Sequence, residues 1–474
     1  MRKTLKVVAI AALALLVAAP AMALDFKFGS EYRVRMFTNT NGQQATLGRD
    51  DGPFTQRGVQ IRIRPRFDVS DDNGNITATL RLEIGDINWG VGGGGSGAPN
   101  NSPAGSNIAS TTTRTGPALG GEIGADGVNI ETKWAYIDFM SPFGIPLRWR
   151  AGIQPWFESK GLIIDDDVAG LRAYGKTGAF SYEVGWYRPT GVCAGVAPVG
   201  ADCTAANTLD NNYDFYEAKA AFAVAKWLNP TAYFIYGNNR ATNTTFVTGS
   251  DISKPVTSQF FGARLDGNFN IFRYDVDFVY GSANGGPSGN FGNAADGRIK
   301  TAGWGIDAGL HFPVGPALLH VVGSYATGDK QNGGNSEALP FISPSWHGAG
   351  GLYELIGNGG AFDQVVATQA YPAGLWMLGF GAEYRPVKAL WLRGMYGFAG
   401  FTGSRANCAG AAAGTCFGPT YTELQGNSTL GHEISFRADY DIYTGFKIQG
   451  GMGWLIPSSG STVGEYVLQL YYNF

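Results

Sequence analysis

The sequence contains few charged residues. Only 15% of its 474 residues are Asp, Glu, Lys or Arg, whereas a soluble globular domain has roughly 25%. Glycine, with 71 residues, and aromatic side chains, at 13%, are abundant instead. Glycine and proline together stay below the roughly 25–30% that marks low-complexity chains. This composition excludes a typical soluble α/β enzyme and a disordered chain, and it favours a large all-β protein with a lipid-facing surface and glycine-rich loops.

Long hydrophobic runs are also missing. Beyond residue 24, no stretch reaches the roughly 18 apolar residues that a transmembrane helix needs, and glycine interrupts almost every helical pattern. The amino terminus has a basic stretch at 2–6, an apolar run at 7–19 and a small–x–small cleavage site at 21–23. We predict that residues 1–23 are a secretory signal peptide, with a retained membrane anchor as the alternative. The chain is therefore expected to be exported.

Motifs that carry enzyme chemistry are absent. The sequence has no His-Glu-x-x-His, Gly-x-Ser-x-Gly, phosphate-binding loop or Cys-x-x-Cys-His motif. His432 and Glu433 are neighbours on a predicted strand, so their side chains point to opposite faces and cannot act together. We predict no enzymatic activity, no catalytic residue, no metal site and no cofactor. The excess of 38 acidic over 35 basic residues also disfavours a nucleic-acid partner.

The carboxyl terminus alternates between apolar and polar residues. Apolar side chains share one face of residues 465–474, and the chain ends on Phe474. This period of two indicates a strand with one apolar and one wet face. A terminal phenylalanine after such a strand resembles the assembly signal of bacterial outer-membrane barrels, which implies that Leu470, Tyr472 and Phe474 address the chain to the outer-membrane assembly machinery. An ordinary amphipathic edge strand is the alternative.

The amino-terminal strands show the same alternation with charged residues on the polar face. In 59–69, Arg62, Arg64 and Arg66 alternate with apolar residues. The apolar set must face lipid, because the opposite register would place three arginines in hydrocarbon at roughly 2–4 kcal/mol each. Pro65 interrupts this strand and removes a ladder donor, so we expect a bulge there.

Eighteen segments have this strand character, and short turns alternate with long loops between them, as in transmembrane barrels. The segments are 25–39, 56–69, 76–86, 128–140, 147–155, 169–175, 179–188, 213–226, 230–238, 258–268, 272–282, 300–312, 317–327, 373–385, 389–400, 429–441, 445–456 and 464–474. Sixteen strands remain open because 169–175 and 230–238 are weak. We predict that residues 24–474 form one all-β, antiparallel transmembrane barrel, surrounded by lipid in the outer membrane of a Gram-negative bacterium.

Four segments resemble the homotrimeric outer-membrane porins of sulfate-reducing bacteria: LEIGDINWG at 82–90, GEIGADGVNIETKWAYIDF at 121–139, AGIQ at 151–154 and DDDVAG at 165–170. The resemblance is clearest over residues 24–190, and it implies a homotrimer with a water-filled diffusion channel. The cysteine-bearing loops depart from this family. The residues GHEISF at 431–436 and GWLIP at 453–457 resemble the closing strands of alginate-exporter-type barrels, which implies a monomeric, substrate-selective transporter instead.

The sequence thus favours a porin for passive diffusion of ions and small hydrophilic solutes. A selective transporter or exporter would share the barrel but show saturable conductance. A scaffold barrel that sheathes an electron-transfer partner would need a haem-bearing protein encoded nearby, and an adhesin would form no channel.

A charged constriction is the predicted site. By strand parity, ten basic side chains point into the lumen: Arg33, Arg35, Arg62, Arg64, Arg66, Arg81, Lys133, Arg148, Arg150 and Arg172. We predict that the third outer loop, 156–168, folds inward and places Asp165, Asp166 and Asp167 opposite them. The resulting transverse field would favour small anions. Three alternatives stay open: a solvated charge run, a calcium site at the aspartates, or neutralisation of the cations by Glu31, Asp68, Glu83 and Glu131.

The four cysteines fall in pairs within two predicted outer loops. An exported chain permits disulfides, and local pairing predicts Cys193–Cys203 and Cys408–Cys416, each contributing about 2–3 kcal/mol. Free thiols are the alternative. Non-reducing peptide mapping distinguishes the two states.

Overall fold

The computed structural model describes residues 24–40, 55–89, 130–142, 144–190, 213–239, 256–285, 299–328, 335, 337–342, 348–356, 374–403, 429–458 and 462–474. The predicted signal peptide and the four cysteines lie outside these residues. Within them, no helix is long and apolar enough to cross a membrane.

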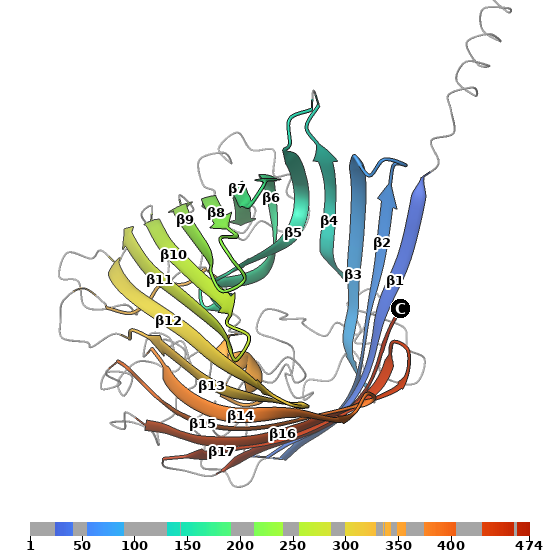
Figure 1. Cartoon of the computed structure of the whole chain (residues 1–474), viewed down its shortest axis with the longest axis vertical. Helices are drawn as coiled ribbons and strands as arrows, with labels where there is room; N and C mark the ends of the chain where they lie inside the picture. Colours follow the sequence, from blue (N-terminus) through green and yellow to red (C-terminus); the bar gives the residue numbers. More distant parts are fainter. Residues whose placement is uncertain are drawn as a thin grey trace, which may run out of the picture.

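Eighteen antiparallel strands form one closed barrel, and the first strand pairs with the last (Figure 1). The strands are β1 (Asp25–Thr40), β2 (Thr55–Ser70), β3 (Ile76–Asn88), β4 (Ile130–Met140), β5 (Arg148–Glu158), β6 (Ile164–Thr177), β7 (Phe180–Thr190), β8 (Tyr213–Phe222), β9 (Asn229–Asn239), β10 (Val256–Asn268), β11 (Arg273–Gly285), β12 (Ile299–Val314), β13 (Ala317–Ala326), β14 (Trp376–Val387), β15 (Leu390–Gly400), β16 (Thr429–Tyr443), β17 (Phe446–Pro457) and β18 (Val463–Asn473). The predicted count of eighteen is confirmed, and sixteen is excluded. Both weak segments are strands, because 169–175 lies within β6 and 230–238 within β9.

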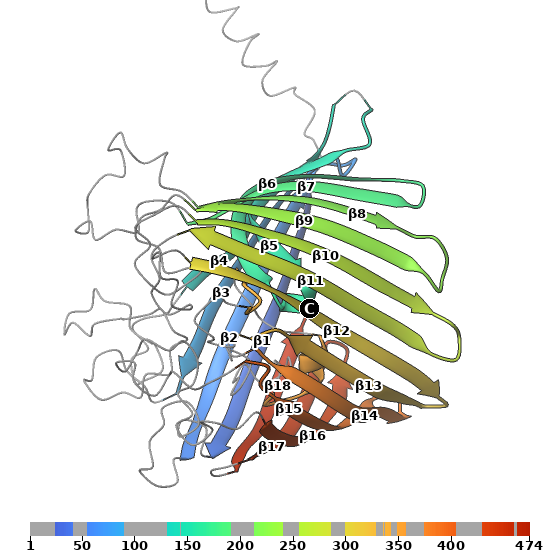
Figure 2. The ribbon, with the colours of Figure 1, turned by 90° about the vertical axis from the view of Figure 1, so that its left-hand side faces the viewer.

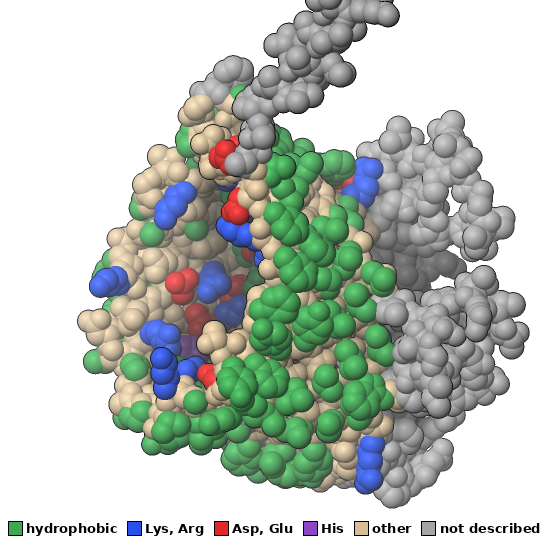
Figure 3. Space-filling view, turned by 90° about the vertical axis from the view of Figure 1, so that its right-hand side faces the viewer, with side chains coloured by type: hydrophobic (Ala, Val, Ile, Leu, Met, Phe, Trp, Pro, Cys, Tyr) green, Lys and Arg blue, Asp and Glu red, His purple; other side chains and the backbone are tan. Residues whose placement is uncertain are grey.

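The outer surface of the barrel is an apolar belt. On β1, Tyr32 and Met36 are 41% and 46% exposed, whereas Arg33 and Arg35, which lie between them in the sequence, are buried. The same alternation runs around the barrel and gives the band of hydrophobic side chains in Figure 3, beside a hollow that contains charged groups. The register that the arginine pattern predicts is therefore confirmed, since the opposite one would expose guanidinium groups to hydrocarbon.

Short turns lie at one end of the barrel, and Figure 2 shows the hairpins β6–β7, β8–β9 and β10–β11 turning at that end. Gly178, with φ of +60°, takes the left-handed conformation that the tight β6–β7 turn requires. Phe474 completes closure near this end. Its backbone exchanges hydrogen bonds with Ser30 of β1 (3.0 and 3.2 Å), and its ring packs on Phe28 and Tyr32.

The predicted bulge at Pro65 is wrong. The register between β2 and β3 is the same on both sides of Pro65, and it shifts between Ile61 and Ile63 instead. Gly85 lies opposite that shift with φ of +127°, and a Cβ there would come within 2.6 Å of the Ile61 carbonyl oxygen. The ladder tolerates the missing proline donor without a shift, whereas the close backbone approach at Gly85 requires a residue without a side chain.

Candidate channel constriction

The β5–β6 hairpin leaves the barrel wall at its far end. β5 pairs with β4 only as far as Ile153, whereas its pairing with β6 continues to Glu158. Beyond Ile153, Trp156 stacks on Tyr187, with ring centroids 4.3 Å apart, and packs against Phe215. These two rings belong to the buried inner faces of β7 and β8. The hairpin therefore enters the lumen and packs against the inner faces of the next strands, β7 and β8.

The range 156–168, predicted as a loop, is mostly strand. β5 and β6 remain paired up to Glu158↔Ile164, so the connection shrinks to residues 159–163, which we call the hairpin tip. Asp165, Asp166 and Asp167 consequently lie on β6 rather than in a loop. The loop assignment is wrong because the strand pattern of this hairpin continues after the hairpin has left the wall.

Lys160 fixes the hairpin tip to the far wall. Its ammonium group binds the carboxylates of Asp275 on β11 and Asp307 on β12, and the Nζ–Oδ1 distance to Asp307 is 2.7 Å. Burial lowers the pKa of Lys160, but the two carboxylates outweigh burial, and the net shift raises the pKa. Ser159 and Lys160 both have φ of +51°, a conformation uncommon for residues with a side chain. The buried ion pairs hold this turn in place.

A second element, residues 348–356, covers the inner wall of β13–β17. We call it the covering segment. The Glu433 carboxylate of β16 accepts hydrogen bonds from the backbone N–H groups of Glu354, Leu355 and Ile356, at 2.8, 3.1 and 2.5 Å. Glu354 in turn binds Arg393 of β15 at 2.7 Å. The carboxylates of Glu433 and Glu354 are almost fully buried, so the segment is bound by polar contacts that water does not reach.

Glycine on the barrel wall makes room for the covering segment. The Tyr353 hydroxyl donates to the carbonyl oxygen of Tyr396 at 2.8 Å. A Cβ on Gly379 would lie 1.6 Å from that hydroxyl. The same end of β16 carries His432, which is exposed and bound to the Tyr396 hydroxyl, whereas Glu433 is buried. These neighbours point to opposite faces, as predicted, but sequence reasoning missed the role of Glu433.

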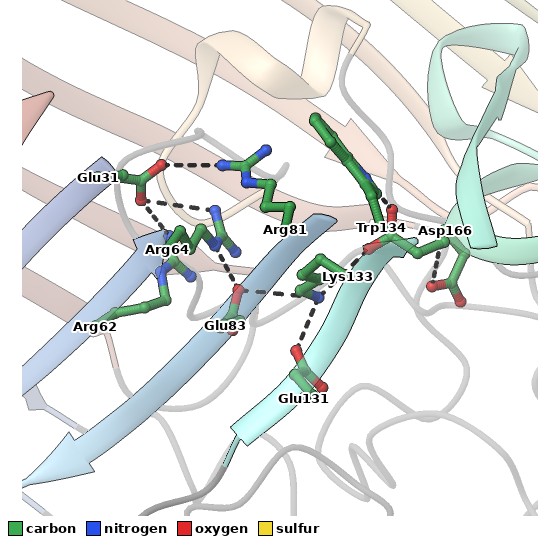
Figure 4. Close-up of polar contacts among 10 residues, drawn as sticks. Glu31, Arg62, Arg64, Arg81, Glu83, Glu131, Lys133, Trp134 and Asp166 are labelled. Carbon is green, nitrogen blue, oxygen red and sulfur yellow. Dashed lines mark hydrogen bonds and ion pairs between the residues drawn. The ribbon is translucent and has the colours of Figure 1, made fainter. Parts of the chain in front are cut away.

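The first five strands of the barrel, β1–β5, have a charged inner face that we call the basic wall (Figure 4). Glu31 lies among Arg62, Arg64 and Arg81, with N–O distances of 3.5, 3.6 and 3.5 Å. Arg64 also binds Glu83. The alternative in which carboxylates neutralise the cations therefore describes much of this wall.

Lys133 and Trp134 link the basic wall to the hairpin. A register shift between β3 and β4 places both residues on the inner face although they are adjacent in sequence. Lys133 lies 3.0 Å from Glu131 and 3.7 Å from Asp167, and the indole N–H of Trp134 donates to Asp167 at 2.8 Å. The Trp134 ring also packs under the guanidinium of Arg81, 4.5 Å away. Asp167 thus contacts the basic wall directly, and Trp134 is a residue of this contact that the sequence alone did not indicate.

The remaining predicted cations form separate groups. Arg66 binds Asp68, Arg148 and Arg150 both bind Asp138, and Arg172 binds Glu183. Arg33 and Arg35 are buried, and Arg35 donates to Gln60. The ten cations share one side of the lumen but do not form a single ring. Six wall carboxylates lie beside them: Glu31, Asp68, Glu83, Glu131, Asp138 and Glu183. The cationic excess is therefore smaller than the predicted one.

Comparison with solved structures identifies the fold. The chain matches Pseudomonas aeruginosa OccK8 (OprE) with a TM-score of 0.54 and 12% identity, covering 95% of this chain and 98% of that one. It matches OccK9 (OpdG) of the same organism with a TM-score of 0.52 and 10% identity, and OpdK with vanillate with 0.50 and 9%, both at the same coverage. No family model and no curated protein matches the sequence. The chain has the fold of an outer-membrane porin, and its apolar belt agrees with the predicted location in the outer membrane of a Gram-negative bacterium.

Proposed function

We propose that this barrel is a channel through which ions and small hydrophilic solutes diffuse passively across the outer membrane. The observation that carries the proposal is the contact of Asp167 with Lys133 and Trp134, which brings the acidic hairpin against the arginines of the basic wall. Positive and negative side chains that line one opening create a field, which orients dipolar solutes and selects ions. The solute path runs along the basic wall, because the hairpin tip and the covering segment fill the other side.

Reversal potentials under a salt gradient test this constriction. The Arg62→Ala, Arg64→Ala double variant removes two cations of the basic wall and should shift selectivity toward cations. The control is Arg437→Ala, which removes the arginine of β16, a cation that binds Asp439 and lies outside the basic wall. A wild-type protein that forms no channel in planar bilayers contradicts the function. If the double variant has the same reversal potential as the wild type, the constriction lies elsewhere.

We further propose a homotrimer, on the resemblance to the porins of sulfate-reducing bacteria and on the closed symmetry that oligomers favour. Light scattering of the detergent-purified protein should give three copies. A monomer would favour the exporter-like alternative. Saturable conductance would favour a substrate-selective channel, and OpdK, whose structure contains vanillate, offers a structural parallel for such a channel.

A further inference from the structure

A second charged site lies at the end of the barrel that carries the short turns. It is a pocket of about 440 Å³ on the inner faces of β1–β6, which we call the mouth pocket. Its charged lining includes Lys27, Arg66, Asp68, Asp138, Arg148 and Arg150. The constriction residues Lys133, Trp134 and Asp167 are not part of this lining. A solute that passes the constriction along the basic wall reaches the mouth pocket next.

The carboxylates of the mouth pocket are occupied by neighbouring donors. Asp138 accepts from Nε of Arg148 at 2.6 Å, from Nε of Arg150 at 2.9 Å and from the Tyr174 hydroxyl. Asp68 accepts twice from Arg66, at 2.7 and 3.1 Å, and once from Thr79 at 2.6 Å. Little acceptor capacity is left in these two groups for a ligand.

Donors remain in excess. Each guanidinium has five N–H groups, and Arg150 uses only Nε for hydrogen bonds among the described residues. Arg148 uses Nε and one bond from Nη1 to the Gly74 carbonyl oxygen at 3.2 Å. Arg150 is also held in place between the rings of Tyr136 and Tyr174, 4.3 and 5.7 Å from its guanidinium carbon. A fixed cation with unused donors suits an anion with several acceptor oxygens.

The lining also distinguishes between classes of anion. It consists of charged residues, hydroxyl residues and two tyrosines, and it contains no aliphatic side chain. The tyrosine faces are already covered by Arg150. An organic carboxylate would find little apolar surface for its carbon skeleton, whereas a tetrahedral oxyanion can accept hydrogen bonds from donors on both β2 and β5.

We propose that the mouth pocket binds a small inorganic oxyanion of the phosphate type as it leaves the constriction. Four cations, Lys27, Arg66, Arg148 and Arg150, face three carboxylates, Asp25, Asp68 and Asp138. One positive charge is thus left for the ligand to neutralise. The inference rests on the proposed channel function, because the ligand reaches the pocket through the lumen.

Single-channel recording tests the proposal with inorganic phosphate as the probe. Phosphate added at constant chloride to the side of the short turns should reduce the chloride current at lower concentration than phosphate added to the other side. The Arg148→Lys, Arg150→Lys double variant keeps both charges but loses guanidinium donors. It should raise the half-blocking concentration about tenfold, since a hydrogen bond to a charged group contributes about 1.5–3 kcal/mol. Arg437→Lys, a cation of the distant strand β16, is the matched control and should not change the block.

Two results would overturn the mouth pocket as an oxyanion site. One is a phosphate block that the double variant leaves unchanged in channels of normal conductance. The other is an equal block by acetate, which would show a response to charge alone. The absence of any channel would instead contradict the proposed function, so the two failures are distinguishable. A difference in electrophoretic mobility between the unheated and the heated double variant would show that its barrel has formed.

Discussion

Two parts of the inner wall, β1–β5 and β7–β17, differ in what covers them. On β1–β5, charged side chains face the lumen directly and pair with one another across strands. On β7–β17, the hairpin tip and the covering segment lie on the wall and bury apolar residues such as Phe215, Ile235 and Met377. Figure 1 shows the covering segment, coloured between β13 and β14, inside the ring of strands.

This difference shows how the side chains of the wall determine where the channel is open. Inward apolar residues would face water in an empty barrel, at about 25 cal/mol for each Å² left exposed. These apolar residues are therefore covered by the hairpin tip or the covering segment, whereas inward arginines and glutamates remain hydrated. Wall glycines also make room for large wall side chains: a Cβ on Gly262 of β10 would lie 1.9 Å from the ring of Tyr233 on the neighbouring strand β9. The open path should follow the charged part of the wall, β1–β5.

The largest expected effect comes from removing the covering segment from the inner wall of β13–β17. Glu433→Ala leaves the N–H groups of Glu354, Leu355 and Ile356 without their acceptor, at about 1–3 kcal/mol for each buried group. The covering segment should detach, and single-channel conductance should increase clearly.

Gly379→Val separates this effect from the loss of a charge. The added side chain occupies the place of the Tyr353 hydroxyl and should also increase conductance. Gly450→Val should not, because Gly450 pairs with the lipid-facing Leu468 and an added Cβ would meet only that side chain, at 4.0 Å. If both Glu433→Ala and Gly379→Val conduct like the wild type, the covering segment does not restrict the lumen.

The second effect concerns the anchor of the hairpin tip. Lys160→Ala removes the ammonium group that Asp275 and Asp307 share, while His311 stays on Asp275 and the Ala349 N–H on Asp307. Breaking a buried ion pair costs roughly 3–5 kcal/mol. The tip should loosen, and the loss of one positive charge should shift the reversal potential toward cations. Lys160→Arg keeps the charge and should restore the wild-type value. A wild-type reversal potential in Lys160→Ala would show that the two aspartates do not influence the permeating ions.

Most of the fold could be predicted from the sequence. Period-two alternation gave all eighteen strands, because lipid forces every strand to separate apolar from polar residues. The bounds were least accurate at β5 and β6, where the hairpin leaves the wall and its outer face no longer meets lipid. Residues 165–167 on β6 are acidic on consecutive positions, so no alternation marks them as strand.

The site was predicted only in part. Strand parity placed the arginines correctly on the inner face, since each follows from its own apolar neighbours. Parity does not reveal partners on distant strands, such as Lys160 with Asp307 or Glu433 with the covering segment. It also fails at a register shift, which is why Trp134 was missed although its neighbour Lys133 was identified.

A smaller effect should come from Asp167, which contacts Lys133 and Trp134 of the basic wall. Asp167→Asn removes one negative charge near Lys133 but keeps an oxygen that can accept from Trp134. Since partly exposed ion pairs contribute about 1 kcal/mol or less, stability should change little and selectivity should shift modestly toward anions. Trp134→Phe is the companion variant, because it removes the N–H donor without changing charge. A reversal potential that moves equally in both variants would mean that side-chain position, not the Asp167 charge, sets selectivity.

The smallest effect is a dependence of the covering segment on pH. Burial raises the pKa of Glu354 to about 7, and Arg393 opposes this shift only partly. When the segment is detached, the carboxyl group should titrate near its ordinary value of 4.5. Between these two values the docked segment binds the proton more tightly, so docking is strongest at low pH and weakens as the pH rises through 7. Amide hydrogen exchange of residues 354–356, corrected for the intrinsic rate, should therefore show less protection at pH 8 than at pH 5. Glu354→Gln cannot titrate and should reduce the difference between the two pH values, although Glu433 still holds the N–H groups of residues 354–356. A wild-type protein without any difference would show that Glu354 does not couple docking to pH.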